Sequence, residues 1–257
     1  MVNRVWRSPA KVNLYLKIVG TRGNYHLIES RFLRVDSLFD EIGFVKERGN
    51  FEIHGFNFPK EQNIIYKTLQ SLLKNLDKNR AKTVTDFFNE YSLKVNKRIP
   101  EMAGLGGGSS NSATFLNMID EVLKLNLSLK KREEIVKPLG SDIIFFLHNT
   151  FSANVSGTGE TVKPLGEETF NIQVFTPPIK CNTGKIYQTY RKSFLEKPNL
   201  IELEVMREMD SLELFNILGI EKANDLYNPA LQVCPDLENY SNENFLFSGS
   251  GSSFFKI

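Results

Sequence analysis

A glycine-rich stretch between a probable strand and a probable helix constrains this chain more than any other feature. Positions 104–108 carry four glycines, and Ser109, Ser110 and Asn111 follow directly. Glycine loses more conformational freedom on folding than other residues, so such a run indicates unusual backbone angles or close approach to another molecule. The helical pattern after the run would leave its amide groups at a helix N-terminus. Free N–H groups and the helix dipole favour phosphate there.

We therefore predict a phosphate-binding loop. Its candidate contacts are Gly104, Leu105, Gly106, Gly107, Gly108, Ser109, Ser110 and Asn111. The alternative is a surface turn followed by an ordinary helix that one of the three polar residues caps. The stretch lacks the Gly-Lys-Ser/Thr end of a P-loop, and Ser109 stands where a dinucleotide-binding pattern requires its last glycine. Both of those nucleotide motifs are therefore excluded.

Composition excludes several other classes. The 32 basic and 30 acidic residues give a net charge of +2, so neither nucleic acid nor an anionic membrane is expected as a partner. The two cysteines are far apart and the three histidines are scattered singly, which favours a reducing compartment and no zinc site. No window approaches the length of a membrane span, and the N-terminal residues lack the apolar core that a signal peptide is expected to have. We expect a cytoplasmic protein, either a monomer or a weak homodimer.

Periodicity indicates a mixed α+β chain. Alternating Val12, Leu14, Leu16 and Ile18 predict a half-buried strand. The same reasoning predicts further strands, helices and one hairpin turn. Strands are expected in 32–45 (interrupted at Asp40), 51–56, 92–95 and 172–175, helices in 64–76, 115–123, 129–137, 185–194 and 200–218, and the turn at 157–159. A change in composition near 166–169 predicts a boundary between domains 1–167 and 168–257.

Three segments, in the order in which the family has its motifs along the chain, resemble the motifs of the GHMP kinases. They are 100–113, Ser-Pro-Ala-Lys-Val-Asn at 8–13, and Phe-Ser-Gly-Ser-Gly-Ser at 247–252. The resemblance implies an ATP-dependent small-molecule kinase with an α+β fold of two domains. A ribosomal-protein-like nucleotide domain would pack on a ferredoxin-like C-terminal domain, with the site in the cleft between them. It also implies Mg²⁺, held by phosphate oxygens and water without a dedicated protein ligand.

Smaller features narrow the resemblance. Tyr25-His26, the segment 97–100 and Gly140-Ser-Asp142 are similar to the members whose substrate carries a cytidine diphosphate group. This implies phosphorylation of the 2-hydroxyl of diphosphocytidyl-methylerythritol, in non-mevalonate isoprenoid biosynthesis. An aromatic pair suits a flat base, because stacking stabilises a bound base by roughly 1–3 kcal/mol.

The same resemblance assigns roles to single residues. Asp142 is the expected base for the attacking hydroxyl, with Lys11 beside it to stabilise negative charge. Asn63 and Lys97 are expected near the adenine. The predicted substrate contacts are Asn13, Tyr25, His26, Thr183, Tyr187 and Gly249.

The sequence also departs from the family pattern. The turn at Arg22-Gly-Asn24 is one residue shorter than the family form, and the chain ends soon after the third motif, so we expect a short C-terminal domain. Two other functions stay open. One is another GHMP kinase, of the homoserine or mevalonate type, and the other is a non-catalytic nucleotide-binding domain.

Overall fold

The structure of the chain is a computed structural model that describes residues 4–194, 198–242 and 244–257. It contains both helices and strands, which confirms the predicted α+β class. Within the described residues, no helix combines the length and apolar character needed to cross a membrane. Two compact units are present. The first comprises the segment that ends at Pro9 with 39–99 and 107–149, and the second comprises 10–38, 100–106 and 150–257. The predicted boundary at 167/168 stays a prediction.

Two long strands dominate the sheet, β1 (Val5–Arg22) and β2 (Tyr25–Lys46), joined by a tight turn at Gly23. The strand predicted from residues 12–18 is confirmed, but it is not half-buried. Lys11, Asn13 and Tyr15, on the face that alternation assigned to solvent, are buried as well. Alternation reports only the apolar face, so it could not show that the polar face is covered too. The predicted interruption at Asp40 is wrong, because this residue lies inside β2.

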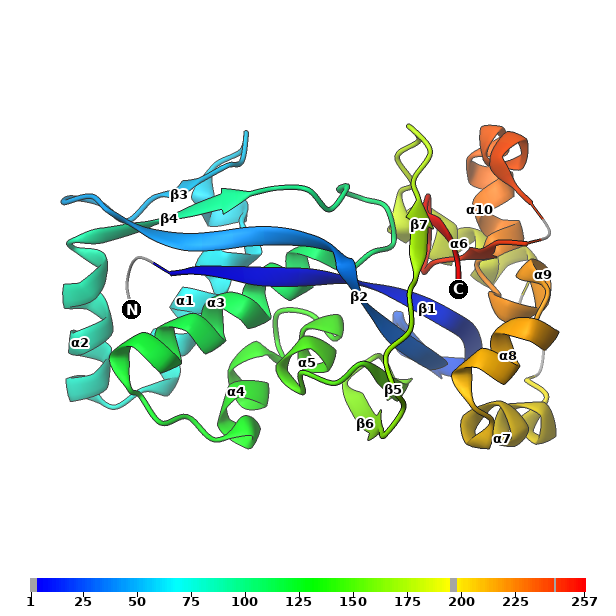
Figure 1. Cartoon of the computed structure of the whole chain (residues 1–257), viewed down its shortest axis with the longest axis horizontal. Coiled ribbons are helices and arrows are strands. Elements are labelled where there is room, and N and C mark those ends of the chain that lie inside the picture. Colours follow the sequence, from blue (N-terminus) through cyan, green and yellow to red (C-terminus); the bar gives the residue numbers. More distant parts are fainter. Residues whose placement is uncertain (1–3, 195–197, 243) are drawn as a thin grey trace. The chain divides into compact units, whose positions relative to one another are not determined.

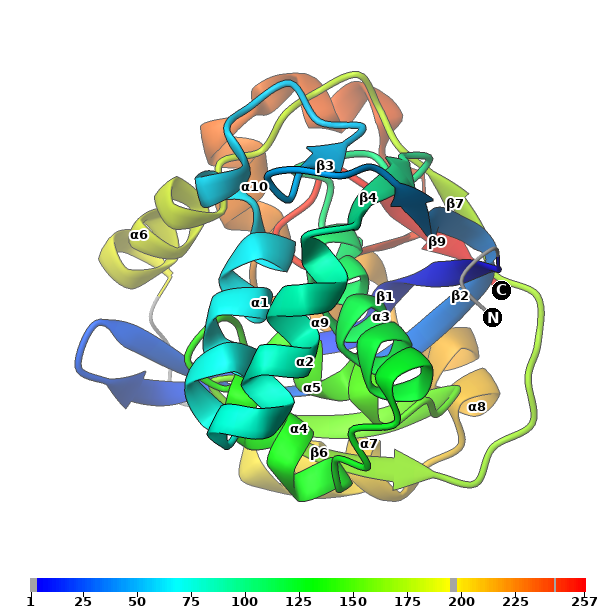
Figure 2. The same cartoon turned by 90° about the vertical axis from the view of Figure 1, so that its left-hand side faces the viewer.

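The first unit places helices against its part of the sheet (Figure 1). Residues 41–46 of β2 pair antiparallel with β4 (Tyr91–Asn96), which pairs in parallel with β3 (Ile53–His54). The helical elements are η1 (Lys60–Gln62), α1 (Ile64–Asn75), α2 (Lys78–Phe88), α3 (Gly107–Leu123), α4 (Leu129–Val136) and α5 (Asp142–Leu147). Figure 2 shows α1, α2 and α3 side by side. Helix α2 was not expected from the sequence.

The second unit contains a hairpin and a small separate sheet. Strand β5 (Ser152–Gly157) pairs with residues 28–33 of β2 and, through the predicted turn, with β6 (Thr161–Leu165). Strands β7 (Gln173–Phe175), β9 (Phe254–Lys256) and β8 (Leu246–Phe247) form a sheet in that order. The ferredoxin-like arrangement stays a prediction.

Among the described residues, five short α-helices and a 3-10 helix complete the second unit. They are α6 (Thr183–Ser193), α7 (Leu200–Glu208), α8 (Ser211–Ile217), α9 (Ile220–Ala223), α10 (Tyr227–Val233) and η2 (Pro235–Tyr240). The helical segment predicted at 200–218 is divided, because Asp210 caps a new helix by accepting a hydrogen bond from the backbone N–H of Leu212. Apolar residues of β1, α6 and α10 share one core with Phe247 and Phe254.

Candidate functional site

In the first unit, the start of α3 is shaped by glycine. A Cβ atom on Gly107 would lie 2.9 Å from Cγ2 of Ile99 and 3.3 Å from Nζ of Lys97, so no side chain fits there without displacing these neighbours. Gly108 is exposed. The N–H groups of the first helical turn have no partners within the helix, which suits this end of α3 to an anion.

A buried polar cluster lies around this helix start. Asn111, on α3, donates from Nδ2 to Oδ2 of Asp40 at 2.8 Å and to Oγ of Ser8 at 3.0 Å. The hydroxyl of Ser8 donates to Oγ of Ser110 at 2.8 Å. Nζ of Lys97 donates to Oδ2 of Asp40 at 2.5 Å. Three of the predicted nucleotide residues, Ser110, Asn111 and Lys97, thus come together with two that the sequence reasoning did not select, Asp40 and Ser8.

Asp40 could have been found from the strand pattern. Successive side chains of a strand point to opposite faces, so Asp40 lies on the same face of β2 as Ile42 and Phe44. Both of these residues are buried, so the side chain of Asp40 belongs to the inward face. A charged residue on a buried face requires a partner. That requirement was the missed signal.

Two predicted nucleotide residues also hold unsatisfied polar atoms. Oδ1 of Asn63 caps α1 by accepting a hydrogen bond from the N–H of Ile65 at 2.9 Å. Nδ2 of Asn63 and Oδ1 of Asn111 are buried and find no hydrogen-bond partner among the described residues. Buried polar atoms are rarely left unpaired in native proteins, so both fit a ligand that offers acceptors and donors.

Asp142, the predicted base, is the first residue of α5 and is half-buried. The five residues after it, 143–147, are all buried and anchor this short helix. Asp142 belongs to the first unit and Lys11 to the second, so their predicted pairing stays a prediction.

In the second unit, Lys11 has an enclosed ammonium group. Its residue is 4% exposed, and Nζ lies 4.5 Å from the ring centroid of Phe32. Nζ donates to Oδ1 of Asn13 at 2.7 Å, and Nδ2 of Asn13 donates to Oγ of Ser30 at 2.9 Å. Ser30 in turn donates to the carbonyl oxygen of Tyr15. This series of donors fixes the orientation of the Asn13 amide.

Residues from all three sequence motifs meet in the second unit. The N–H of Lys11 donates to the carbonyl of Leu105 at 3.0 Å, and the hydroxyl of Ser248 hydrogen-bonds to the carbonyl of Gly104 at 3.0 Å. A Cβ atom on Gly249, whose φ is 58°, would lie 3.2 Å from the Gly104 carbonyl oxygen and 3.4 Å from Oδ1 of Asn13. The structure therefore brings Gly104, Asn13 and Gly249 together.

Two further side chains form hydrogen bonds with the third motif, residues 247–252. The hydroxyls of Thr183 and Ser250 are 2.7 Å apart and hydrogen-bonded. The buried side chain of Asn224 donates from Nδ2 to the carbonyl oxygens of Phe247 at 2.9 Å and Gly249 at 2.8 Å. Asn224 was not selected from the sequence, and no local pattern distinguishes it.

The predicted aromatic residues are only partly assembled. The ring centroids of His26 and Tyr187 are 5.0 Å apart with the planes tilted by 36°, and Tyr190 meets His26 edge-on at 6.0 Å. Tyr25 is 70% exposed and makes no ring contact with the described residues. His26 and Tyr187 thus form the nearer pair.

His26 has the properties of a neutral recognition group. Its Nε2 atom is buried and has no hydrogen-bond partner in the described parts of the chain. Burial, together with the positive charge of Arg191, lowers the pKa of His26 below its ordinary value. The neutral ring offers one donor and one acceptor.

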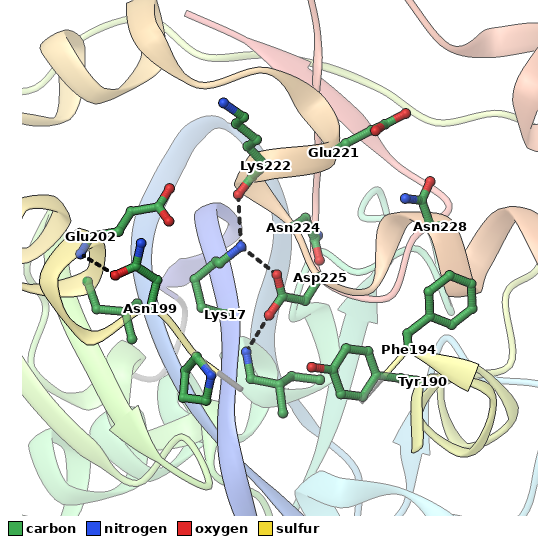
Figure 3. A pocket seen from close by; sticks show the side chains of 13 residues that line it. Lys17, Tyr190, Phe194, Asn199, Glu202, Glu221, Lys222, Asn224, Asp225 and Asn228 are labelled. Atoms are coloured by element: carbon green, nitrogen blue, oxygen red, sulfur yellow. Dashed lines mark hydrogen bonds and ion pairs between the residues drawn. The ribbon is translucent and has the colours of Figure 1, made fainter. Parts of the chain in front are cut away.

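A separate cavity of about 350 Å³ lies in the second unit (Figure 3). Lys17 donates there to the carbonyl of Lys222 at 3.1 Å and pairs with Asp225 at 2.5 Å. Tyr190 lines the cavity and also touches His26, but none of the predicted site residues lines it. No group of three or more His, Cys, Asp or Glu residues that could hold a metal ion occurs in the described ranges.

Residues 63–150 match the family described as the GHMP kinases N terminal domain. The 4-diphosphocytidyl-2-C-methyl-D-erythritol kinase of Sulfurimonas denitrificans is 44% identical over 260 residues, which cover 100% of this chain and 98% of that protein. The protein of the same name from Helicobacter pylori is 34% identical, covering 100% of this chain and 95% of its own length.

Solved structures agree in fold. A crystal structure of 4-(cytidine 5'-diphospho)-2C-methyl-D-erythritol kinase superposes with a TM-score of 0.73 at 27% identity, covering 98% of this chain and 89% of that one. The mevalonate kinase of Methanococcus jannaschii has a TM-score of 0.59 at 14% identity, covering 99% and 90%. The latter likeness concerns the fold alone.

Proposed function

The chain belongs to the family of 4-diphosphocytidyl-2-C-methyl-D-erythritol kinases, and we propose that it phosphorylates 4-diphosphocytidyl-2-C-methyl-D-erythritol with ATP. We assign the transfer to the 2-hydroxyl group of the methylerythritol unit. The structural observation that carries this proposal is the buried, unpaired Nε2 of His26 beside the ring of Tyr187. It gives this chain a feature that suits a flat, polar base and that a mevalonate or homoserine substrate would not need.

The ATP side of the reaction fits the first unit. The glycine-lined start of α3, where Gly108 is exposed, suits phosphate, and the unsatisfied atoms of Asn63 and Asn111 suit the polar groups of a nucleotide. In our proposal, 107–111 with Asn63 and Lys97 hold the nucleotide, and Gly104, Leu105 and Gly106 supply further backbone groups. ATP provides the phosphoryl group, and the protein positions it and compensates its charge.

The cytidine diphosphate side fits the second unit. His26 would read the polar edge of the cytosine, and Tyr187 would stack on its face. Tyr25 is exposed and would close on the other face of the base. Asn13 and Thr183, both held by hydrogen bonds, and the backbone of Gly249 would contact the remainder of the substrate.

For the transfer itself we assign Asp142 as the base that accepts the proton of the attacking hydroxyl. We assign Lys11 to stabilise the negative charge that develops on that oxygen. Lys11 is almost fully buried, and a charge interacts more strongly in such an environment than in water. Magnesium completes the proposal, held by phosphate oxygens and water. The predicted cytoplasmic localisation and oligomeric state stay predictions.

An ADP-release assay tests this function. Purified protein, ATP and Mg²⁺ are offered diphosphocytidyl-methylerythritol, mevalonate, homoserine or galactose in separate reactions. We expect ADP only with the cytidyl substrate. If ADP is released only with another substrate, the assignment to the GHMP kinases stands, but the proposed role of His26 and Tyr187 is rejected. If folded protein binds ATP but releases no ADP with any substrate, the non-catalytic alternative is favoured.

A further inference from the structure

Asp40 is a fully buried carboxylate in the first unit that accepts four hydrogen bonds. Oδ2 accepts from Nζ of Lys97 at 2.5 Å and from Nδ2 of Asn111 at 2.8 Å. Oδ1 accepts from the backbone N–H groups of Arg98 at 2.7 Å and Ile99 at 2.9 Å. One side chain on β2 therefore holds three parts of the nucleotide region: a lysine, the backbone that precedes the glycine-rich stretch, and helix α3.

This arrangement compensates the charge of the lysine. Burying a carboxylate is unfavourable unless it is paired and hydrogen-bonded, and Asp40 meets both conditions. Because the Lys97 ammonium contacts Asp40 directly, the pair carries no net charge. Lys97 is thereby poorly suited to act as a counter-ion for phosphate, but it keeps its capacity to donate hydrogen bonds.

The position of Lys97 is equally defined. Its Nζ lies 3.3 Å from where a Cβ atom of Gly107 would stand, at the first residue of α3. Its side chain is 18% exposed, and within residues 4–194, 198–242 and 244–257 its ammonium group makes no hydrogen bond besides that to Asp40. An ammonium group has three N–H donors, so two remain for a ligand at the helix start.

We propose that Asp40 is a positioning residue for nucleotide binding. Its carboxylate orients the Lys97 ammonium at the start of α3 as a donor to uncharged polar groups of the nucleotide, and it fixes the backbone of residues 98–99 that leads into the glycine-rich stretch. This inference rests on the proposed function, because it assumes that ATP binds at this end of α3. Asp40 itself touches no ligand in this scheme.

The test is a double-mutant cycle on ATP affinity. The four proteins are the wild type, Asp40→Asn, Lys97→Met and the double variant, each titrated calorimetrically with ATP and Mg²⁺. Asp40→Asn keeps the size of the side chain but replaces one acceptor oxygen by an amide and removes the charge that holds the lysine. We expect each single variant to bind ATP about tenfold more weakly, the range for losing a hydrogen bond to a charged group. We expect the double variant to bind no more weakly than Lys97→Met.

A kinetic readout separates positioning from general damage. Because Asp40 lies among the nucleotide residues, Asp40→Asn should raise the KM for ATP and leave the KM for the cytidyl substrate within about twofold, whereas loss of native structure would affect both. Glu41→Gln is the matched control. It removes the neighbouring carboxylate on the same strand, which pairs with Arg98 at 2.9 Å near the surface, and should leave ATP affinity unchanged.

The outcomes are distinct. Two results would overturn the inference. One is that Asp40→Asn binds ATP within twofold of the wild type. The other is that the losses of ATP affinity in the two single variants multiply in the double variant. Wild-type protein that binds no ATP would overturn the proposed function and the inference together. If Asp40→Asn does not fold, the double variant decides, since removing both members of a buried ion pair is tolerated better than removing one. If the double variant binds ATP as tightly as Lys97→Met does, the inference is supported. If its loss of ATP affinity is more than threefold larger than that of Lys97→Met, the inference is contradicted.

Discussion

The hydroxyl of Ser248 donates a hydrogen bond to the carbonyl oxygen of Gly104 at 3.0 Å, across 144 positions of the sequence. The carbonyl of Ser248 also occupies the space that a side chain on Gly104 would need, and Gly104 has a φ of 76°. Two glycine-rich motifs at opposite ends of the chain therefore depend on each other for their shape.

Gly104→Ala should destabilise the protein by about 2 kcal/mol, because a Cβ atom meets the Ser248 carbonyl and the left-handed backbone becomes strained. Thermal unfolding measures the change. Gly166→Ala is the control, since a Cβ atom there would meet nothing within 4 Å beyond its chain neighbours, and its φ is not in the left-handed range. Equal melting temperatures for the two variants would contradict the packing described for Gly104.

Asp142→Asn should lower kcat by about 10²- to 10⁴-fold, the range that general base catalysis contributes. ATP affinity should stay near that of the wild type, because the variant keeps the size of the side chain. Calorimetry with ATP and the ADP-release assay measure the two quantities. Unchanged turnover would remove Asp142 from the mechanism.

Lys11→Met should lower kcat at least about 10²-fold, because the ammonium group that stabilises negative charge is lost. A methionine fits the enclosed position against Phe32, so the protein should remain folded. Lys17→Met, on the same strand, breaks the ion pair with Asp225 and serves as the control. It should lower the melting temperature but preserve kcat, and an equal loss of turnover in both variants would argue against a special role for Lys11.

The affinity for the cytidyl substrate should depend on the protonation of His26. Burial, together with the positive charge of Arg191, lowers the pKa of His26 in the free protein, so the ring gains its proton at a lower pH than an ordinary histidine. The KM for this substrate should therefore be constant from pH 7 to 8 and rise as the pH falls below 6.5. His26→Gln should abolish this rise, whereas His54→Gln, at an exposed histidine, should retain it. A profile that is identical in His26→Gln and the wild type would contradict recognition by His26.

Arg31→Met should destabilise the second unit by about 3 kcal/mol. The buried guanidinium donates to the carbonyls of Met206 at 3.0 Å, Arg207 at 2.8 Å and Met209 at 2.5 Å at the end of α7, and the variant removes all three of these hydrogen bonds. Arg22→Met is the control, because the Arg22 side chain of the Arg22–Glu160 pair is 61% exposed and the pair should contribute less than about 1 kcal/mol. Chemical denaturation compares the two variants, and similar losses would show that burial of Arg31 is unimportant.

Several elements could be predicted because their signals are local. The glycine run that leads into α3, the alternation in β1, the apolar periodicity of α1 and the Gly157 turn are each contained in a few adjacent residues. Helix α2 was missed because its apolar positions are few, and the division at Asp210 was missed because the capping signal lies within a helical pattern. Periodicity over a window cannot detect either case.

For the site, the sequence by itself determined the residue types that can bind phosphate, accept a proton and stack on a base, together with their order along the chain. Only the tertiary structure decided which of them meet. It buried Lys11 and Asn13 on the second face of β1, set His26 against Tyr187 while Tyr25 stayed exposed, and gave Asp40 its partners Lys97 and Asn111. The physical reason is that burial and pairing depend on segments far apart in the chain, whereas propensity and periodicity report only on neighbours.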